Sequence, residues 1–230
     1  IIPQLSAAGI EVQTWRNAEN KGCSEARNEA WSLVKRPYTL FLDNDTAVCS
    51  AAWLSALTSC MENHPSVGIL GPKLIYPYRP HPIQCAGVII NRNGRVAFRG
   101  RGRNREQPEM NTFRTVHALI SACWIMRTEL REDVGMLDPL FHPVQYEDLD
   151  LCLRARKAGY EIAYTPDVEM YHFEGITTAA SGRKQYSRTI ARNSLTFRKR
   201  WHEEFKTYEE ELPQEAFSWL ADDELGLSKD

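Results

Sequence analysis

Hydrophobic positions in the first 75 residues switch between two periodicities. The continuous apolar run at 38–42, YTLFL, is typical of a strand that is buried on both faces of a sheet. Apolar residues near helical spacing occupy 23–35 before it and 50–65 after it, and strand character returns at 66–71. In the second helix, Ser50 is the expected N-cap, and Pro65 lies beyond the expected end. Strands that alternate with helices predict an α/β sheet.

The remaining segments predict elements of both kinds. They are a hairpin at 86–100 with its turn at Asn93–Gly94, a loop at 100–112, a strand that leads into a helix at 116–130, a helix at 146–158 stopped by Gly159, short strands at 160–166 and 168–173, and a basic amphipathic helix at 187–205. We expect one domain at 1–205 and an acidic C-terminal tail at 206–230.

The first fifteen residues suggest the end of a helix, a turn at Gly9 and a strand at 10–15. This start is typical of the middle of a domain. We therefore expect that the chain lacks the first strands of its sheet.

Composition narrows the class of partner. The 230 residues are 43% hydrophobic and 25% charged with a net charge of −2, which is ordinary for a globular protein and indicates no nucleic-acid partner. Basic residues are nevertheless concentrated at 92–105 and 183–200. Both runs are explained by solvated surface, and the helix at 184–200 also suits peripheral contact with an anionic membrane surface.

The six cysteines show no C-x-x-C or zinc-like spacing, and several lie in apolar segments. We interpret them as reduced structural thiols. No apolar run reaches membrane-spanning length, and no signal peptide is recognisable. These features predict a cytoplasmic location, with peripheral contact at the inner membrane face as a further expectation.

Two acidic clusters carry the candidate chemistry. Asp43 and Asp45 follow the strand at 38–42, where ligands of α/β sheets bind, and paired carboxylates suit Mg²⁺ or Mn²⁺. Turn formation alone also explains such a pair. Glu147, Asp148 and Asp150 open the helix at 146–158. Helix capping and an Asp150–Arg154 pair explain part of this cluster, but a carboxylate held ionised at a helix N-terminus can also act as a base.

Two further positions are weaker candidates. His172 follows a strand and is either structural or a third metal ligand. Asn20 and Gly22 predict a turn before the helix that carries Arg27, which is either a surface residue or part of a nucleotide-binding corner.

The order of these motifs is more specific than any one of them. N-x-G-x-x-x-A-R-N, L-D-N-D-T, S-A-C-W-I-M-R, E-D-L-D-L-C-L-R-x-x-x-x-G-Y and a strand ending in His follow one another from about residue 10 to about residue 200. This series resembles the family 2 glycosyltransferases, especially the rhamnosyltransferase-like branch that builds bacterial cell-surface polysaccharides. The resemblance implies a GT-A fold, which is Rossmann-like, with a mixed, mainly parallel sheet flanked by helices.

The resemblance also implies roles for individual residues. Asp148 corresponds to the catalytic base, with Glu147 beside it, and Asp45 and His172 correspond to metal ligands. The expected donor-binding residues are Asn20, Arg27, Asp43, Asn44, Asp45, Ser121 and Ala122. Ser121 departs from the glycine that is usual at its position, and the D-N-x-S-x-D segment that normally opens the family is absent from this sequence.

The implied function is inverting, Mg²⁺- or Mn²⁺-dependent transfer of a sugar from a nucleotide-sugar to a hydroxyl of a glycan or lipid-linked acceptor. Three alternatives stay open at this point. The first is an inactive GT-A-like module that binds a sugar nucleotide or glycan, and the second is a nucleotidyltransferase of similar fold. The third is a haloacid-dehalogenase-like phosphatase, whose D-x-D-x-T motif requires threonine where this chain has Ala47.

Overall fold

The computed structural model describes residues 2–174, 183–212 and 216–218. In these residues the largest element is a seven-stranded sheet with the path β1-β8-β3-β9-β2, to which β4 adds at β3 and β7 at β9. The strands are β1 (Tyr38–Leu42), β2 (Thr46–Val48), β3 (Val67–Ile75), β4 (Ile83–Cys85), β7 (Arg114–Thr115), β8 (Cys123–Arg127) and β9 (Glu161–His172).

The strand directions are mixed, as predicted, but antiparallel pairs dominate. Among the described pairings of this sheet, only β3 with β9 is parallel. The expectation of mainly parallel pairing is wrong because β8 lies between β1 and β3 and is antiparallel to both. β1 and β3 therefore run in the same direction, as their connecting helix predicts, without pairing directly.

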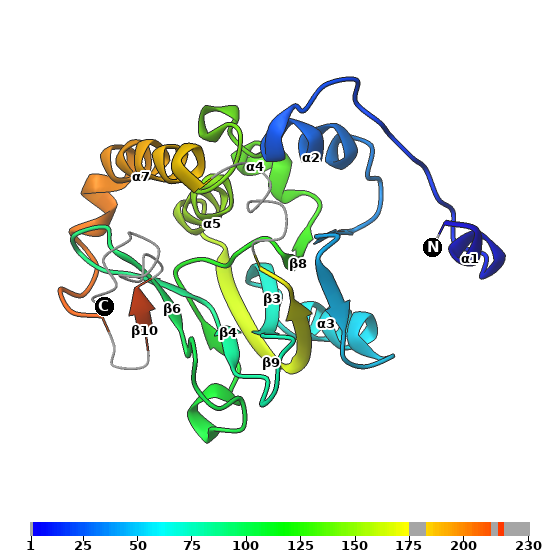
Figure 1. The fold of residues 1–230 in the computed structure, drawn as a ribbon, viewed down its shortest axis with the longest axis horizontal. Helices are drawn as coiled ribbons and strands as arrows, with labels where there is room; N and C mark the ends of the chain where they lie inside the picture. The colour runs from blue at the N-terminus through cyan, green and yellow to red at the C-terminus, as the bar shows by residue number, and fades with distance from the viewer. Residues whose placement is uncertain (1, 175–182, 213–215, 219–230) are drawn as a thin grey trace.

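Helices cover both faces of the sheet (Figure 1). They are α2 (Gly22–Ser32), α3 (Trp53–Asn63), α4 (Leu130–Val134), α5 (Glu147–Lys157) and α7 (Arg183–Phe205). α3 packs on one face, where Leu57 and Met61 join Leu70 of β3 in one apolar cluster. On the other face, Trp31 of α2 and Ile69 of β3 belong to a larger cluster shared with α5 and α7. β3 is buried along its whole length because its alternate side chains enter both clusters.

A smaller sheet contains the predicted hairpin. β5 (Val88–Ile90) pairs with β6 (Val96–Arg99), and β10 (Ala216–Ser218) pairs with β6 on its other side. The turn residue Gly94 has a φ of 68°, and a Cβ there would lie 2.7 Å from the Phe205 ring. Glycine is thus required both for the backbone conformation and for the approach of α7.

The chain before α2 differs from the prediction. α1 (Ile2–Ala7) and a positive φ at Gly9 confirm the expected helix and turn. Residues 10–15, however, form no strand and pair with no described strand, and Trp15 is 60% exposed. In Figure 1 this segment runs away from the sheet as an extended arm ending at α1, so it has no strand edge with which to pair.

Two boundaries also differ. The two short strands predicted around Pro166 form one strand, β9, because a register shift opposite β3 accommodates the proline, which has no N–H to donate. Ser50 is not the N-cap of α3: the helix begins at Trp53 after a turn at 51–52, and no side chain caps it. Its end at Asn63, before Pro65, agrees with the prediction.

The loop predicted at 100–112 includes one turn of 3-10 helix, η1 (Pro108–Met110), and a second such turn, η2 (Pro139–Phe141), precedes α5. Much of the predicted acidic tail, 213–215 and 219–230, lies outside the described residues. In the described part of the chain, no helix is both long enough and apolar enough to cross a membrane.

Candidate active site

The turn after β1 places two carboxylates beside the end of β9. The Asp43 N–H donates to the Ala122 carbonyl at 2.9 Å, and the Thr46 hydroxyl donates to the Asp43 carbonyl at 2.7 Å. β2 then pairs antiparallel with β9, with Thr46 opposite His172. Backbone pairing therefore fixes the turn and the histidine together, although they are separated by more than 120 positions in the sequence.

Asp43, Asp45 and His172 form a group that could hold a metal ion. One ligand atom from each of them lies within 4.8 Å of the others, and His172 Nε2 is 3.6 Å from Asp45 Oδ1. All three side chains are half-buried. Two carboxylate oxygens with one imidazole nitrogen suit Mn²⁺ and also accommodate Mg²⁺, so the residues present fit the divalent cation that the sequence predicts.

Arg27 connects this group to the start of α5. Its guanidinium donates to Asp43 Oδ1 and to the Ser121 hydroxyl, and it lies over the Phe41 ring at 5.3 Å. The Ser121 N–H in turn donates to Asp148 Oδ2 at 3.2 Å. The predicted residues from four distant segments thus form one continuous set of contacts.

The backbone before α5 is unusual. Gln145 and Tyr146 both have positive φ values, 84° and 78°, which non-glycine residues rarely adopt. The side-chain amide of buried Asn193 on α7 donates to the carbonyls of Phe141, Val144 and Gln145. These bonds fix the conformation that directs the first turn of α5 toward the 121–122 segment.

The pKa values of the two carboxyl groups depend on burial as well as on the helix N-terminus. Burial raises the pKa of Asp148, even though the Leu149 N–H at 2.8 Å and the Ser121 N–H favour its charged form. Burial and the neighbouring Asp148 charge raise the pKa of Glu147 to about 7. One Glu147 oxygen has no hydrogen-bond partner among the described residues. A carboxylate with a raised pKa is a stronger base than an ordinary one.

We expect Glu147 to make the protein less stable as pH rises. Its pKa is higher in the folded state, about 7, than its ordinary value of 4.5, so between these values the native state binds more protons than the unfolded state. The free energy of unfolding must then fall across this window. Urea titrations at several pH values measure the free energy of unfolding. In Glu147→Gln its fall with pH should be smaller, because glutamine does not ionise. The exposed-site control Glu132→Gln should keep the wild-type slope, and an unchanged slope in Glu147→Gln would contradict the assignment.

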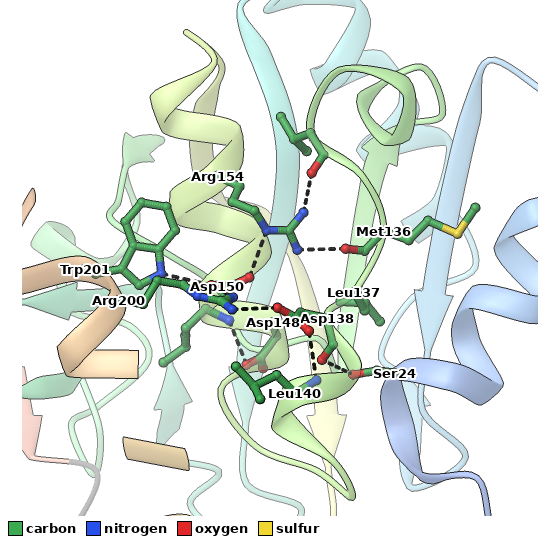
Figure 2. A network of polar contacts seen from close by, with 12 residues as sticks. Ser24, Met136, Leu137, Asp138, Leu140, Asp148, Asp150, Arg154, Arg200 and Trp201 are labelled. Carbon is green, nitrogen blue, oxygen red and sulfur yellow. Dashed lines mark hydrogen bonds and ion pairs between the residues drawn. The ribbon is translucent and has the colours of Figure 1, made fainter. Parts of the chain in front are cut away.

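Asp150, the third acid of the cluster, has a structural role (Figure 2). It is fully buried and accepts from Arg154 Nε at 2.8 Å, which confirms the predicted i,i+4 pair. Its other oxygen accepts from Arg200 Nη1 and Trp201 Nε1 of α7, both at 2.9 Å. Arg200 also pairs with Asp138 at 2.7 Å. The contacts of Asp150 therefore hold α7 against α5.

Asp150→Ala should lower the free energy of unfolding by about 3–5 kcal/mol, the usual cost of removing one partner from a buried ion pair. The variant leaves Arg154 Nε and the Trp201 indole N–H without their acceptor. Urea unfolding at neutral pH measures the change. Glu203→Gln, on the same end of α7 but largely exposed, should change stability by less than about 0.5 kcal/mol. A small effect of Asp150→Ala would show that these contacts do not hold the two helices together.

The same contacts alter the predicted basic face of α7. Arg200 is committed to Asp138 and Asp150, and Arg192 donates to the His142 carbonyl. Arg198 and Lys199 are exposed, and the side chains of 183–186 lie outside the described residues. Membrane contact through this helix stays a prediction that rests on fewer charges than the sequence suggests.

Three other predicted donor-binding residues, Asn20, Asn44 and Ala122, take part in turns. The Asn20 side chain accepts from the Gly22 N–H at 2.9 Å and so forms a turn before α2, while Asn44 is exposed in the Asp43–Thr46 turn. Ala122 contributes its carbonyl to that turn. The donor-binding roles of Asn20 and Asn44 stay predictions.

The six cysteines are free thiols, as predicted. Two residues at the site were not predicted: Gln84, which contacts His172, and Asn193, which holds the 141–145 loop. Gln84 lies in a three-residue strand without any motif. Asn193 lies within a helix whose basic residues dominate its pattern. Neither position gives a sequence signal of its role.

Comparison with known proteins decides the family. Residues 3–193 match the sequence profile described as Glycosyltransferase like family 2. The chain belongs to this family. The matched range of this family 2 glycosyltransferase domain includes both the predicted D-x-D turn and the E-D helix. The alternative interpretation of Asp43 and Asp45 as a phosphatase motif is therefore left without support.

Three curated relatives are similar to this chain. An uncharacterized protein of Sinorhizobium fredii, y4gI, is 28% identical over 205 residues, covering 86% of this chain and 22% of the relative. The O-antigen biosynthesis protein RfbC of Myxococcus xanthus is 33% identical over 149 residues, covering 61% and 11%. The pre-mycofactocin glycosyltransferase of Mycobacterium tuberculosis is 25% identical over 165 residues, covering 72% and 33%. The chain thus spans from about a tenth to a third of the length of these relatives.

Solved structures support the GT-A fold. GalNAc-T7, solved with UDP, GalNAc and Mn²⁺, matches with a TM-score of 0.59 at 14% identity, covering 74% of this chain and 33% of that one. The mannosyltransferase PcManGT of Pyrobaculum calidifontis, solved with GDP-Man and Mn²⁺, matches with a TM-score of 0.50 at 13% identity, covering 74% and 42%. These similarities confirm the predicted mixed α/β architecture of a GT-A glycosyltransferase.

Proposed function

We propose that this family 2 domain transfers a sugar, with inversion, from a nucleotide-sugar to an acceptor hydroxyl in cell-surface polysaccharide synthesis. One observation carries the proposal: the Asp43, Asp45 and His172 group is connected through Arg27 and Ser121 to half-buried Asp148. A leaving-group site and a base are thus held in one framework. The O-antigen biosynthesis relative and the Mn²⁺-bound structural neighbours support the biological context and the cation.

The donor side of the proposed site consists of Asp45, His172 and Asp43. These residues would hold Mn²⁺ or Mg²⁺, which supplies charge neutralisation for the diphosphate of the departing nucleotide. Arg27 adds a fixed positive charge at the same place. Its contacts with Asp43, Ser121 and the Phe41 ring keep the guanidinium oriented before the donor binds.

The acceptor side consists of Asp148 and Glu147. Asp148 would take the hydroxyl proton while the acceptor oxygen attacks the anomeric carbon and the bond to the diphosphate breaks. Its raised pKa makes it a better proton acceptor, and its two backbone N–H contacts keep it in place. Glu147, with its pKa raised to about 7, binds a proton more readily than an ordinary carboxylate, which limits repulsion between the two carboxyl groups.

We also propose that residues 1–205 form one functional domain and that it works on the cytoplasmic side. Exposed Arg198 and Lys199 would there approach an anionic membrane surface that carries a lipid-linked acceptor. Such attraction is worth about 1 kcal/mol for each basic residue near the surface. The two residues together would therefore contribute only about 2 kcal/mol to membrane attraction.

A donor screen tests the proposed function. The chain is incubated with UDP-, GDP- and TDP-sugars, Mn²⁺ and cell-surface glycan acceptors, and release of nucleoside diphosphate is measured. We expect one donor to give release that requires both acceptor and divalent cation. Tight donor binding by calorimetry without release under any of these conditions would favour the inactive binding module instead.

A further inference from the structure

Gln84 contacts His172 at the ring nitrogen that does not face Asp45. It lies at the centre of β4, and its side chain is fully buried. Its Oε1 is 2.6 Å from His172 Nδ1. The other ring nitrogen, Nε2, is the one that lies 3.6 Å from Asp45 Oδ1. The imidazole is thus held between a buried amide and the carboxylate group.

The surroundings of Gln84 determine which way its amide points. The Nε2 group donates to the His172 carbonyl and to Glu174 Oε2, each at 3.3 Å. Both of these partners are acceptors only. Reversing the amide would place its oxygen against two other oxygens, so Oε1 must be the atom that faces His172.

Glu174 strengthens this orientation. Its carboxylate also accepts from Arg101 at 3.0 and 3.3 Å and from the Tyr76 hydroxyl at 3.2 Å. A carboxylate bound by an arginine stays an acceptor, so it continues to require the N–H of Gln84. The orientation of the amide therefore follows from four surrounding groups and not from a single contact.

The orientation of the amide sets the tautomer of the histidine. Because Gln84 Oε1 can only accept, His172 Nδ1 must carry the hydrogen. In the neutral ring Nε2 then has a free lone pair, directed to the side where Asp45 lies. A metal-binding histidine commonly has its second nitrogen fixed in this way by an outer acceptor, and loss of that partner typically costs 10–100-fold in metal affinity.

We propose that Gln84 is a positioning residue that holds His172 as the Nδ1-protonated tautomer, with Nε2 ready to bind a divalent cation. This inference rests on the proposed metal-assisted function and extends it to a residue outside the family motifs. Gln84 itself does not touch the cation or the substrate. It acts only through the ring of His172.

Two measurements test the proposal. Nitrogen-15 NMR of the histidine-labelled, metal-free protein reports the tautomer, and we expect His172 to be protonated at Nδ1. Electron paramagnetic resonance with Mn²⁺ alone reports affinity, and Gln84→Met should weaken binding by about 10–100-fold. Methionine has a similar length and no hydrogen-bonding amide. Ile83→Val, a buried change on the same strand, is the control and should bind Mn²⁺ as the wild type does.

The outcomes separate this inference from the proposed function. Absence of Mn²⁺ binding by the wild-type protein would overturn the metal site and the role of Gln84 with it. Normal binding by both the wild type and Gln84→Met would overturn only the role of Gln84. A wild-type His172 protonated at Nε2 would also overturn it, and this reading is obtained even if Gln84→Met does not fold.

Discussion

Asp148→Asn should lower kcat by on the order of 10²–10⁴-fold, the usual contribution of one acid–base group, with donor affinity nearly unchanged. Asparagine keeps the shape of the side chain, but its single oxygen can accept from only one of the Ser121 and Leu149 N–H groups, which donate to different Asp148 oxygens. It cannot take the acceptor proton. Steady-state kinetics with saturating donor and Mn²⁺ would measure the loss.

Glu147→Gln is the matched control for Asp148→Asn. It is the same type of change on the adjacent residue of α5, and we expect a much smaller loss because Glu147 is assigned a neutral role. Near-normal turnover by Asp148→Asn would contradict the assignment of the base. A large loss only in Glu147→Gln would move the base to that residue.

Asp45→Ala should weaken Mn²⁺-dependent binding of the donor nucleotide by at least about 100-fold. Removing a direct ligand should cost more than removing an outer partner, for which 10–100-fold is typical. The fold should remain intact, because the Asp45 side chain lies at the edge of the sheet and outside the apolar core. Calorimetry with UDP, GDP and TDP, each with Mn²⁺, would measure the loss.

Glu62→Ala, which removes an exposed carboxylate on α3 outside the site, is the control for Asp45→Ala and should keep the affinity. Thermal unfolding of both variants should agree with the wild type within about 0.5 kcal/mol. Unchanged nucleotide binding by Asp45→Ala would show that the cation is held elsewhere or not at all.

The candidate site was largely predictable from the sequence because its residues follow strand and helix ends. β1 could be recognised from its apolar run, and the position of Asp43 and Asp45 after it followed directly. The acidic first turn and the basic last turn likewise predicted α5. The meeting of His172 with Asp45 was correctly expected, since a strand was predicted to end at that histidine.

What could not be predicted depends on contacts between distant segments. The order of strands was one such property: β8 enters between β1 and β3, and no local pattern shows this. The raised pKa of Glu147 was another, because it comes from burial by surrounding segments, which no local pattern shows. Gln84 and Asn193 act through single buried amides, and a lone amide has no periodicity to detect.

The anomeric configuration of the product tests the central claim most directly. The claim is that a hydroxyl deprotonated by Asp148 displaces the nucleoside diphosphate in a single step. NMR of the purified product, formed with the donor that the screen identifies, should show the configuration opposite to that of the donor sugar. A product that retains the donor configuration would contradict single displacement, and with it the role of Asp148.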